Sequence, residues 1–130
     1  PCSVHCVSAF DELIACLKKF KNHPPIIIHS FSGSMELARS LSQFGCLFSV
    51  GRNLNHNPGK KQTEMLKYIF PSLMMLESDF SASNTPENMS TDIKPYCIKD
   101  YLNNASEILS IPAEEIAEKT YKLSAAVFGE

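Results

Sequence analysis

Four short apolar runs recur along the chain at nearly regular intervals. They cover residues 2–5, 26–29, 46–50 and 73–76, and they begin about 20 to 27 residues apart. Each run is too short for a free-standing helix and lacks a clean alternation of polar and apolar residues. Such runs are typical of strands that are buried on both faces of a parallel sheet. The sequence therefore predicts four parallel strands.

Segments with helical character separate these runs. Residues 10–20 carry apolar side chains at helical spacing. Residues 34–41 begin with a serine suited to capping a helix and are closed by Gly45, and Pro71 ends a third helix over residues 60–70. Strands that alternate with helices in this rhythm predict consecutive βα units with right-handed crossovers.

Residues 81–95 are rich in Ser, Asn, Thr and Pro and are predicted to form a loop, followed by helices over residues 98–109 and 112–128. Four βα units make half of a TIM-like (β/α)8 barrel, and a complete barrel takes about 250 residues. A half-barrel alone leaves unpaired sheet edges. We therefore expect residues 1–130 to be the C-terminal half of a larger α/β domain whose N-terminal half is missing. An open sheet is the alternative.

Composition narrows the functional classes. A hydrophobic fraction of 44% with 20% charged residues is typical of a globular domain. The net charge of −2 gives no overall basic surface, so binding a polyanion would need local cations or a metal. No apolar run approaches the roughly 20 residues that span a bilayer. No obligate protein partner is evident.

The cysteines are five in number and scattered. An odd, dispersed set favours a reducing compartment over a disulfide framework, which predicts a cytoplasmic or nuclear protein. Most of them lie in apolar runs, where a free thiol behaves as a small hydrophobic side chain.

Three polar residues lie at or just beyond the carboxyl ends of predicted strands: His5, His29 and Asp79. Active sites of parallel α/β folds are built at that end of the strands. Imidazole and carboxylate are ligands for zinc, manganese or magnesium. Each residue alone is more often structural, a hydrogen-bonded histidine or a capping aspartate, and it is their shared position that indicates a metal site.

The chain resembles the TatD family of metal-dependent deoxyribonucleases in three segments. Residues 1–7 (PCSVHCV) resemble the family segment PVSVHCV, residues 27–34 (IIHSFSGS) resemble its HSFSGS signature, and residues 76–79 (LESD) resemble its LETD signature. The order, the intervals and the C-terminal helix pair are also similar to that family, so the resemblance covers nearly the whole chain.

The resemblance implies a TIM-like barrel with one or two divalent metal ions (Mg, Zn or Mn) and DNA as the substrate. It implies that His5 and His29 bind one metal, and that Asp79 is a catalytic residue that binds a metal and helps to handle the proton of the attacking water. A divalent metal lowers the pKa of bound water from about 16 toward 7.

The chain also departs from the family pattern. Ser8 stands where the family usually has arginine, and Leu123 stands where asparagine is common. Losing the arginine removes a bidentate partner for a phosphate or carboxylate. The N-terminal HxH pair and the bridging glutamate of the family are also missing, so this fragment alone is expected to be inactive.

Substrate-binding residues cannot be assigned from the sequence. Arg52, Lys60 and Lys61 share a predicted loop region at the carboxyl end of the third strand and are candidates for phosphate contacts, although a solvated loop is the slightly preferred explanation. His56 in the same loop is a candidate for touching the substrate. Backbone amides over residues 30–33 are another candidate for meeting an anion, with a simple helix cap as the plainer explanation.

Three functions remain in competition. The first is a metal-dependent deoxyribonuclease that cleaves phosphodiester bonds through an activated water. The second is a metal-dependent amidohydrolase acting on a small amide or ester, because fold does not fix chemistry. The third is a catalytically dead remnant that serves as a binding module, for which Ser8 and Leu123 would be signs of decay.

Overall fold

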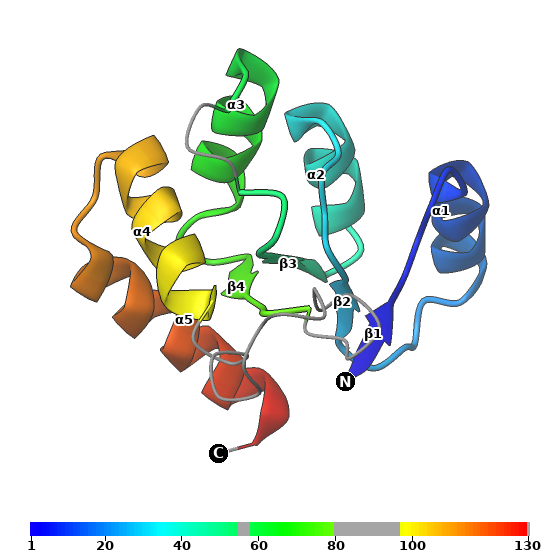
Figure 1. Cartoon of the computed structure of the whole chain (residues 1–130). Helices are drawn as coiled ribbons and strands as arrows, with labels where there is room; N and C mark the ends of the chain where they lie inside the picture. Colours follow the sequence, from blue (N-terminus) through cyan, green and yellow to red (C-terminus); the bar gives the residue numbers. More distant parts are fainter. Residues whose placement is uncertain (55–57, 80–96, 130) are drawn as a thin grey trace, which may run out of the picture.

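The computed structural model describes residues 1–54, 58–79 and 97–129. Within them four parallel strands form one sheet in the order of the chain, each hydrogen-bonded to the next (Figure 1). This arrangement confirms the predicted strands and their parallel pairing. The strands are β1 (Cys2–Val4), β2 (Ile26–Ile28), β3 (Cys46–Val50) and β4 (Met74–Leu76).

Helices follow each strand and form an arc along one side of the sheet, from α1 beside β1 to the α4–α5 pair beside β4 (Figure 1). Both α4 and α5 contact β4 and pack against each other. The βα alternation and the two closing helices agree with the predicted architecture. The helices are α1 (Phe10–Lys19), α2 (Met35–Ser42), α3 (Lys60–Ile69), α4 (Cys97–Leu109) and α5 (Ala113–Phe128).

The residues predicted to begin and end the second helix, Ser34 and Gly45, lie on either side of it in the structure. The Ser34 side chain accepts a hydrogen bond from the backbone N–H of Leu37 at 3.2 Å, which caps α2. Gly45 has a φ of 74°, a conformation that favours glycine, where the chain turns from α2 into β3. The loop predicted over residues 81–95 lies outside the described residues.

One face of the sheet packs against the helices and forms the hydrophobic core. The core draws Phe48 from β3, Leu41 from α2 and Leu66 from α3, all fully buried. Cys46 belongs to the same cluster, and burial raises the pKa of its thiol to about 11. A neutral thiol in an apolar cluster is a packing residue, as expected for a cysteine in a strand.

The opposite face of the sheet carries a different set of side chains. Ile27 and Met75 are buried but do not belong to the core cluster. Successive side chains of a strand alternate between faces, so these two point away from the helices. Two residues further along each strand, the same face presents His29 and Glu77, and this places the polar residues at the carboxyl edge.

Among the residues that the structure describes, no helix is both long and apolar enough to cross a lipid bilayer.

Candidate metal centre

The three residues singled out in the sequence all lie at the carboxyl edge of the sheet. His5 follows β1, His29 follows β2, and Asp79 lies three residues beyond β4. The hydrogen-bond ladder continues past the strand ends, because the backbone N–H of His29 donates to Val4 O at 2.9 Å. This continuation fixes the His29 backbone firmly against the neighbouring strand.

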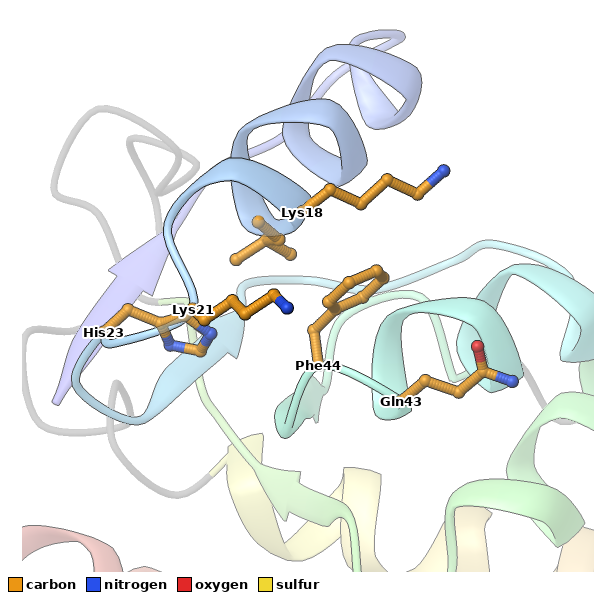
Figure 2. Close-up of a pocket in the computed structure, with 6 residues that line it drawn as sticks. Lys18, Lys21, His23, Gln43 and Phe44 are labelled. Atoms are coloured by element: carbon orange, nitrogen blue, oxygen red, sulfur yellow. The ribbon is translucent and has the colours of Figure 1, made fainter.

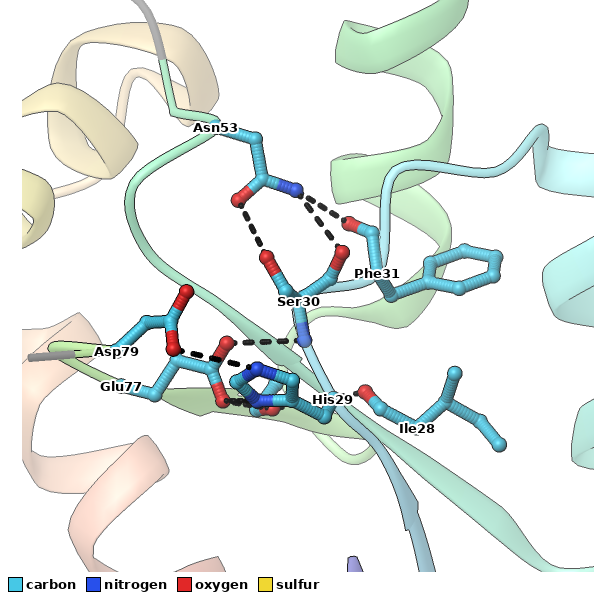
Figure 3. Close-up of polar contacts among 8 residues, drawn as sticks. Ile28, His29, Ser30, Phe31, Asn53, Glu77 and Asp79 are labelled. Carbon is cyan, nitrogen blue, oxygen red and sulfur yellow. Dashed lines mark hydrogen bonds and ion pairs between the residues drawn. The ribbon is translucent and has the colours of Figure 1, made fainter. Parts of the chain in front are cut away.

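The His29 ring lies between two carboxylates (Figure 3). Its Nδ1 is 2.8 Å from Oε2 of Glu77, and its Nε2 is 3.4 Å from Oδ1 of Asp79. The His29 and Glu77 side chains are 22% and 18% exposed, against 36% for Asp79. The ring is thus held on its inner side by Glu77, and its other nitrogen faces the more accessible Asp79.

His5 is the neighbour of this group. Its ring centroid is 5.5 Å from that of His29, with the two planes inclined by 40°. His5 is exposed, whereas His29 is half-buried. The structure therefore brings His29 and Asp79 to within 3.4 Å of each other and places the His5 ring beside that of His29.

Glu77 was not singled out from the sequence, although its carboxylate contacts three other residues of the site. Its Oε2 accepts hydrogen bonds from His29 Nδ1 and from the Ser49 hydroxyl, and its Oε1 accepts from the Ser30 N–H at 2.9 Å. The signal that would have found it is strand alternation. Glu77 lies two residues after the buried Met75, so it continues the face that carries His29.

The backbone around the site adopts conformations that are uncommon for side-chain-bearing residues. Ser8, Ser30 and Asp79 have φ values of 54°, 49° and 44°. Each follows a strand at the carboxyl edge. Non-glycine residues in this region cost about 1–3 kcal/mol and tend to gather at functional sites. Their position agrees with a functional role for this edge.

Asn53 joins the loop after β3 to the loop after β2 (Figure 3). Its Nδ2 donates to the carbonyl oxygens of Ser30 at 3.2 Å and Phe31 at 3.1 Å. Its Oδ1 accepts a longer bond of 3.4 Å from the Ser30 hydroxyl. The Asn53 carbonyl in turn accepts from Gln62 of α3. The segment that carries His29 is thereby tied to its neighbour.

Two of the backbone amides considered as an anion site, those of Ser30 and Phe31, donate to protein acceptors instead. The Ser30 N–H donates to Glu77, and the start of α2 is capped by Ser34. Capping, the plainer explanation, is the one that this geometry supports.

The donor set fits a divalent cation in its chemistry. An imidazole nitrogen and a carboxylate oxygen face each other, and the other ring nitrogen donates to a second carboxylate, the usual arrangement around metal-binding histidines. Within residues 1–54, 58–79 and 97–129, however, no group of three or more His, Cys, Asp or Glu side chains is close enough to hold a metal by itself.

Basic residues flank the same edge of the sheet. Arg52 is exposed in the turn after β3, and Lys60 and Lys61 are exposed in the first turn of α3. Lys60 forms an ion pair of 3.8 Å with Glu64 one helical turn later. All three side chains are thus exposed to solvent at this edge, and His56 lies outside the described residues.

The two departures from the family pattern lie apart in the chain and differ in exposure. Ser8 is exposed in the turn after β1, and Leu123 is half-buried on α5. No described contact of either side chain shows what replaces the arginine or the asparagine.

A separate pocket lies at the other end of the sheet, between the carboxyl ends of α1 and α2 (Figure 2). His23 lines it, and its Nδ1 is 2.9 Å from the carbonyl oxygen of Pro24 in the connection to β2. Lys18, Lys21 and Phe44 line it as well. Strand starts, not strand ends, surround this pocket, so it is distinct from the candidate metal centre.

Similarity to solved structures establishes the fold. The chain superposes on a TatD homologue from Escherichia coli K12 with a TM-score of 0.80 at 21% identity, covering 98% of this chain and 49% of that one. A TatD-family hydrolase from Entamoeba histolytica gives a TM-score of 0.72 at 19% identity, covering 96% and 49%. An uncharacterized amidohydrolase from Saccharomyces cerevisiae gives 0.78 at 14% identity, covering 98% and 53%.

These coverages show that the chain spans about half the length of the structures it matches. The predicted half of a TIM-like barrel is therefore confirmed. Comparison with curated proteins gave no match. A family model described as TatD related DNase matches residues 1–129, nearly the entire chain. The chain belongs to the family of TatD-related DNases.

Proposed function

We propose that the protein containing this chain is a metal-dependent hydrolase that cleaves phosphodiester bonds in DNA. Membership of the family supports hydrolase activity in general terms. The observation that carries the proposal is the His29 ring, whose Nε2 faces the Asp79 carboxylate at 3.4 Å at the carboxyl edge of a parallel sheet. This is where ligands and reacting groups collect in such folds.

The chain's own residues have distinct roles in this proposal. His5 and His29, through imidazole nitrogens, and Asp79 would contribute to holding a divalent cation together with further ligands, since the described residues contain no group of three that could hold a metal by itself. Asp79 would also accept the proton of the attacking water, because its carboxylate is the most accessible of the contacting acids. When bound, the cation would supply Lewis-acid chemistry at the phosphate.

Positively charged side chains near the site favour a nucleic acid as the substrate. The net charge of −2 gives this chain no overall basic character, but Arg52 and Lys61 are exposed at the same edge as His29. Phosphate contacts of this kind position a nucleic acid without reading its sequence. We therefore propose that DNA contacts this edge. Replacing Arg52 should weaken DNA binding and leave the metal ligands unchanged.

The test uses full-length protein prepared free of metal and then supplied with magnesium, manganese or zinc. His29→Ala should lower metal-stimulated DNA cleavage by more than about 100-fold, beyond the 10- to 100-fold typical of residues that only support a ligand. His23→Ala is the matched control, since His23 lies at the other end of the sheet, and it should cleave as the wild type does.

Three results would contradict this proposal. Full activity in His29→Ala would remove the histidine from the chemistry. Preference for a small amide over DNA in a substrate panel would favour the amidohydrolase alternative. Absence of metal-stimulated cleavage of DNA, RNA and model phosphodiesters would favour a remnant with a binding role.

A further inference from the structure

We propose that Glu77 is a positioning residue: it fixes the orientation of the His29 ring and keeps a proton on Nδ1, so that Nε2 presents its lone pair toward Asp79. This inference rests on the proposed function, because its purpose is to prepare Nε2 as a metal ligand. Glu77 itself is not assigned to the metal or to the reacting atoms.

The proton placement follows from the contact between His29 and Glu77. Nδ1 is 2.8 Å from Oε2, a normal hydrogen-bond distance. An ionised carboxylate only accepts hydrogen bonds, so Nδ1 must carry the hydrogen. In a neutral imidazole the other nitrogen then has a free lone pair. That nitrogen is the one that faces Asp79 Oδ1 at 3.4 Å.

The Glu77 carboxylate is itself held in place from two other strands. Ser30 after β2 donates its backbone N–H to Oε1 at 2.9 Å, and the buried Ser49 of β3 donates its hydroxyl to Oε2. Hydrogen bonds to an ionised acceptor are stronger than neutral ones. With these donors in place, the carboxylate cannot rotate freely, and neither can the ring that it supports.

Gly51, just after β3, leaves room for the backbone of Glu77. A Cβ atom added to Gly51 would lie 2.2 Å from the carbonyl oxygen of Glu77 and 3.2 Å from its Cγ. Gly51 follows β3 directly, and the Glu77 N–H donates to Val50 O at 3.0 Å. Only glycine allows the backbone just after β4 to approach this closely, so the position of Glu77 depends on the absence of a side chain there.

The arrangement also separates Glu77 from a ligand role. Both of its oxygens already accept hydrogen bonds from protein donors, and it lies on the Nδ1 side of the ring. Asp79 occupies the Nε2 side. Two carboxylates two residues apart thus have different tasks, with one holding the ring and the other sharing the cation.

The test is Glu77→Gln in the full-length protein, with zinc as the probe. A glutamine amide can donate to Nδ1, which favours the tautomer with the hydrogen on Nε2. Long-range ¹H–¹⁵N NMR spectra of the neutral ring, recorded without metal at alkaline pH, should show His29 protonated on Nδ1 in the wild type and on Nε2 in the variant. Zinc affinity by calorimetry should fall about 10- to 100-fold.

Two further variants keep the proposal testable if Glu77→Gln folds poorly. Glu77→Asp retains an acceptor-only group, so the hydrogen should stay on Nδ1 and zinc affinity should fall less than in Glu77→Gln. The matched control is Glu115→Gln on the exposed start of α5, which should change neither the tautomer nor the affinity.

A double-mutant cycle separates positioning from direct ligation. If Glu77 acts through His29, adding Glu77→Gln to His29→Ala should weaken zinc binding no further. An equal additional loss in both backgrounds would identify Glu77 as an independent ligand and overturn the proposal. An unchanged tautomer together with unchanged zinc affinity in Glu77→Gln would also overturn it.

The outcomes also distinguish this inference from the proposed function. If the wild-type protein cleaves no DNA but Glu77→Gln shifts the tautomer and weakens zinc binding, the proposed function fails and the positioning role stands. If His29→Ala abolishes cleavage while Glu77→Gln leaves tautomer and zinc affinity unchanged, the function stands and the positioning role fails.

Discussion

Glu77 and Asp79 are two residues apart, and they contact opposite nitrogens of the same imidazole ring. The sequence predicted that His29 and Asp79 would lie at strand ends, because buried apolar runs mark where strands finish. It did not assign the contacts of Glu77. Those contacts depend on the register between β2 and β4 across β3. This register is not encoded in a local pattern.

Gly51 provides a prediction at the residue scale. Gly51→Ala would place a methyl group against the carbonyl oxygen of Glu77, where a Cβ would lie at 2.2 Å. The backbone must shift, and overpacking of this kind costs about 1–3 kcal/mol in the free energy of unfolding. Chemical denaturation should show this loss, and zinc affinity should fall because Glu77 is displaced.

Gly59→Ala is the matched control for Gly51→Ala. A Cβ at Gly59 meets nothing within 4 Å, and its φ of −64° is open to any residue. Because Gly59 caps α3, alanine there should cost at most about 1 kcal/mol, and zinc affinity should not change. Equal effects of the two substitutions on zinc affinity would contradict the role given to Gly51.

At the scale of elements, the loops after β2 and β3 act as one unit. Asn53 donates to Ser30 O and Phe31 O, and Gln62 of α3 donates to the Asn53 carbonyl. The sequence predicted both strands and both following helices, with their caps and stops. It did not predict the link between the loops, because a side-chain bond across 22 residues has no periodic signature.

Asn53→Ala should therefore loosen the segment that carries His29. The carbonyl oxygens of Ser30 and Phe31 lose a donor, and unsatisfied polar groups of this kind cost about 1–3 kcal/mol in the free energy of unfolding. Asn53→Ala should therefore lower both the free energy of unfolding and the affinity for zinc. The exposed Asn103 of α4 offers the control, since Asn103→Ala should stay within about 0.5 kcal/mol. A stable Asn53→Ala protein with wild-type zinc affinity would contradict the link.

At the scale of the whole molecule, the sequence predicted half of a barrel, and the structure confirms it. The interval between apolar runs was sufficient for this, because consecutive βα units have few topological alternatives. The complete metal centre could not be predicted in the same way. Within the described residues, His5, His29 and Asp79 do not form a group that could hold a metal by itself, so the proposed centre would need further ligands.

In the proposed site, His29 Nε2 and Asp79 bind a divalent cation while Glu77 holds Nδ1. A crystal structure of the full-length protein with zinc, using anomalous scattering to locate the metal, tests it most directly. We predict a zinc peak about 2.0–2.1 Å from His29 Nε2, in contact with Asp79, with the bond from Nδ1 to Glu77 retained. A zinc peak on Nδ1 or on Glu77, or one away from His29 altogether, would contradict the proposed site.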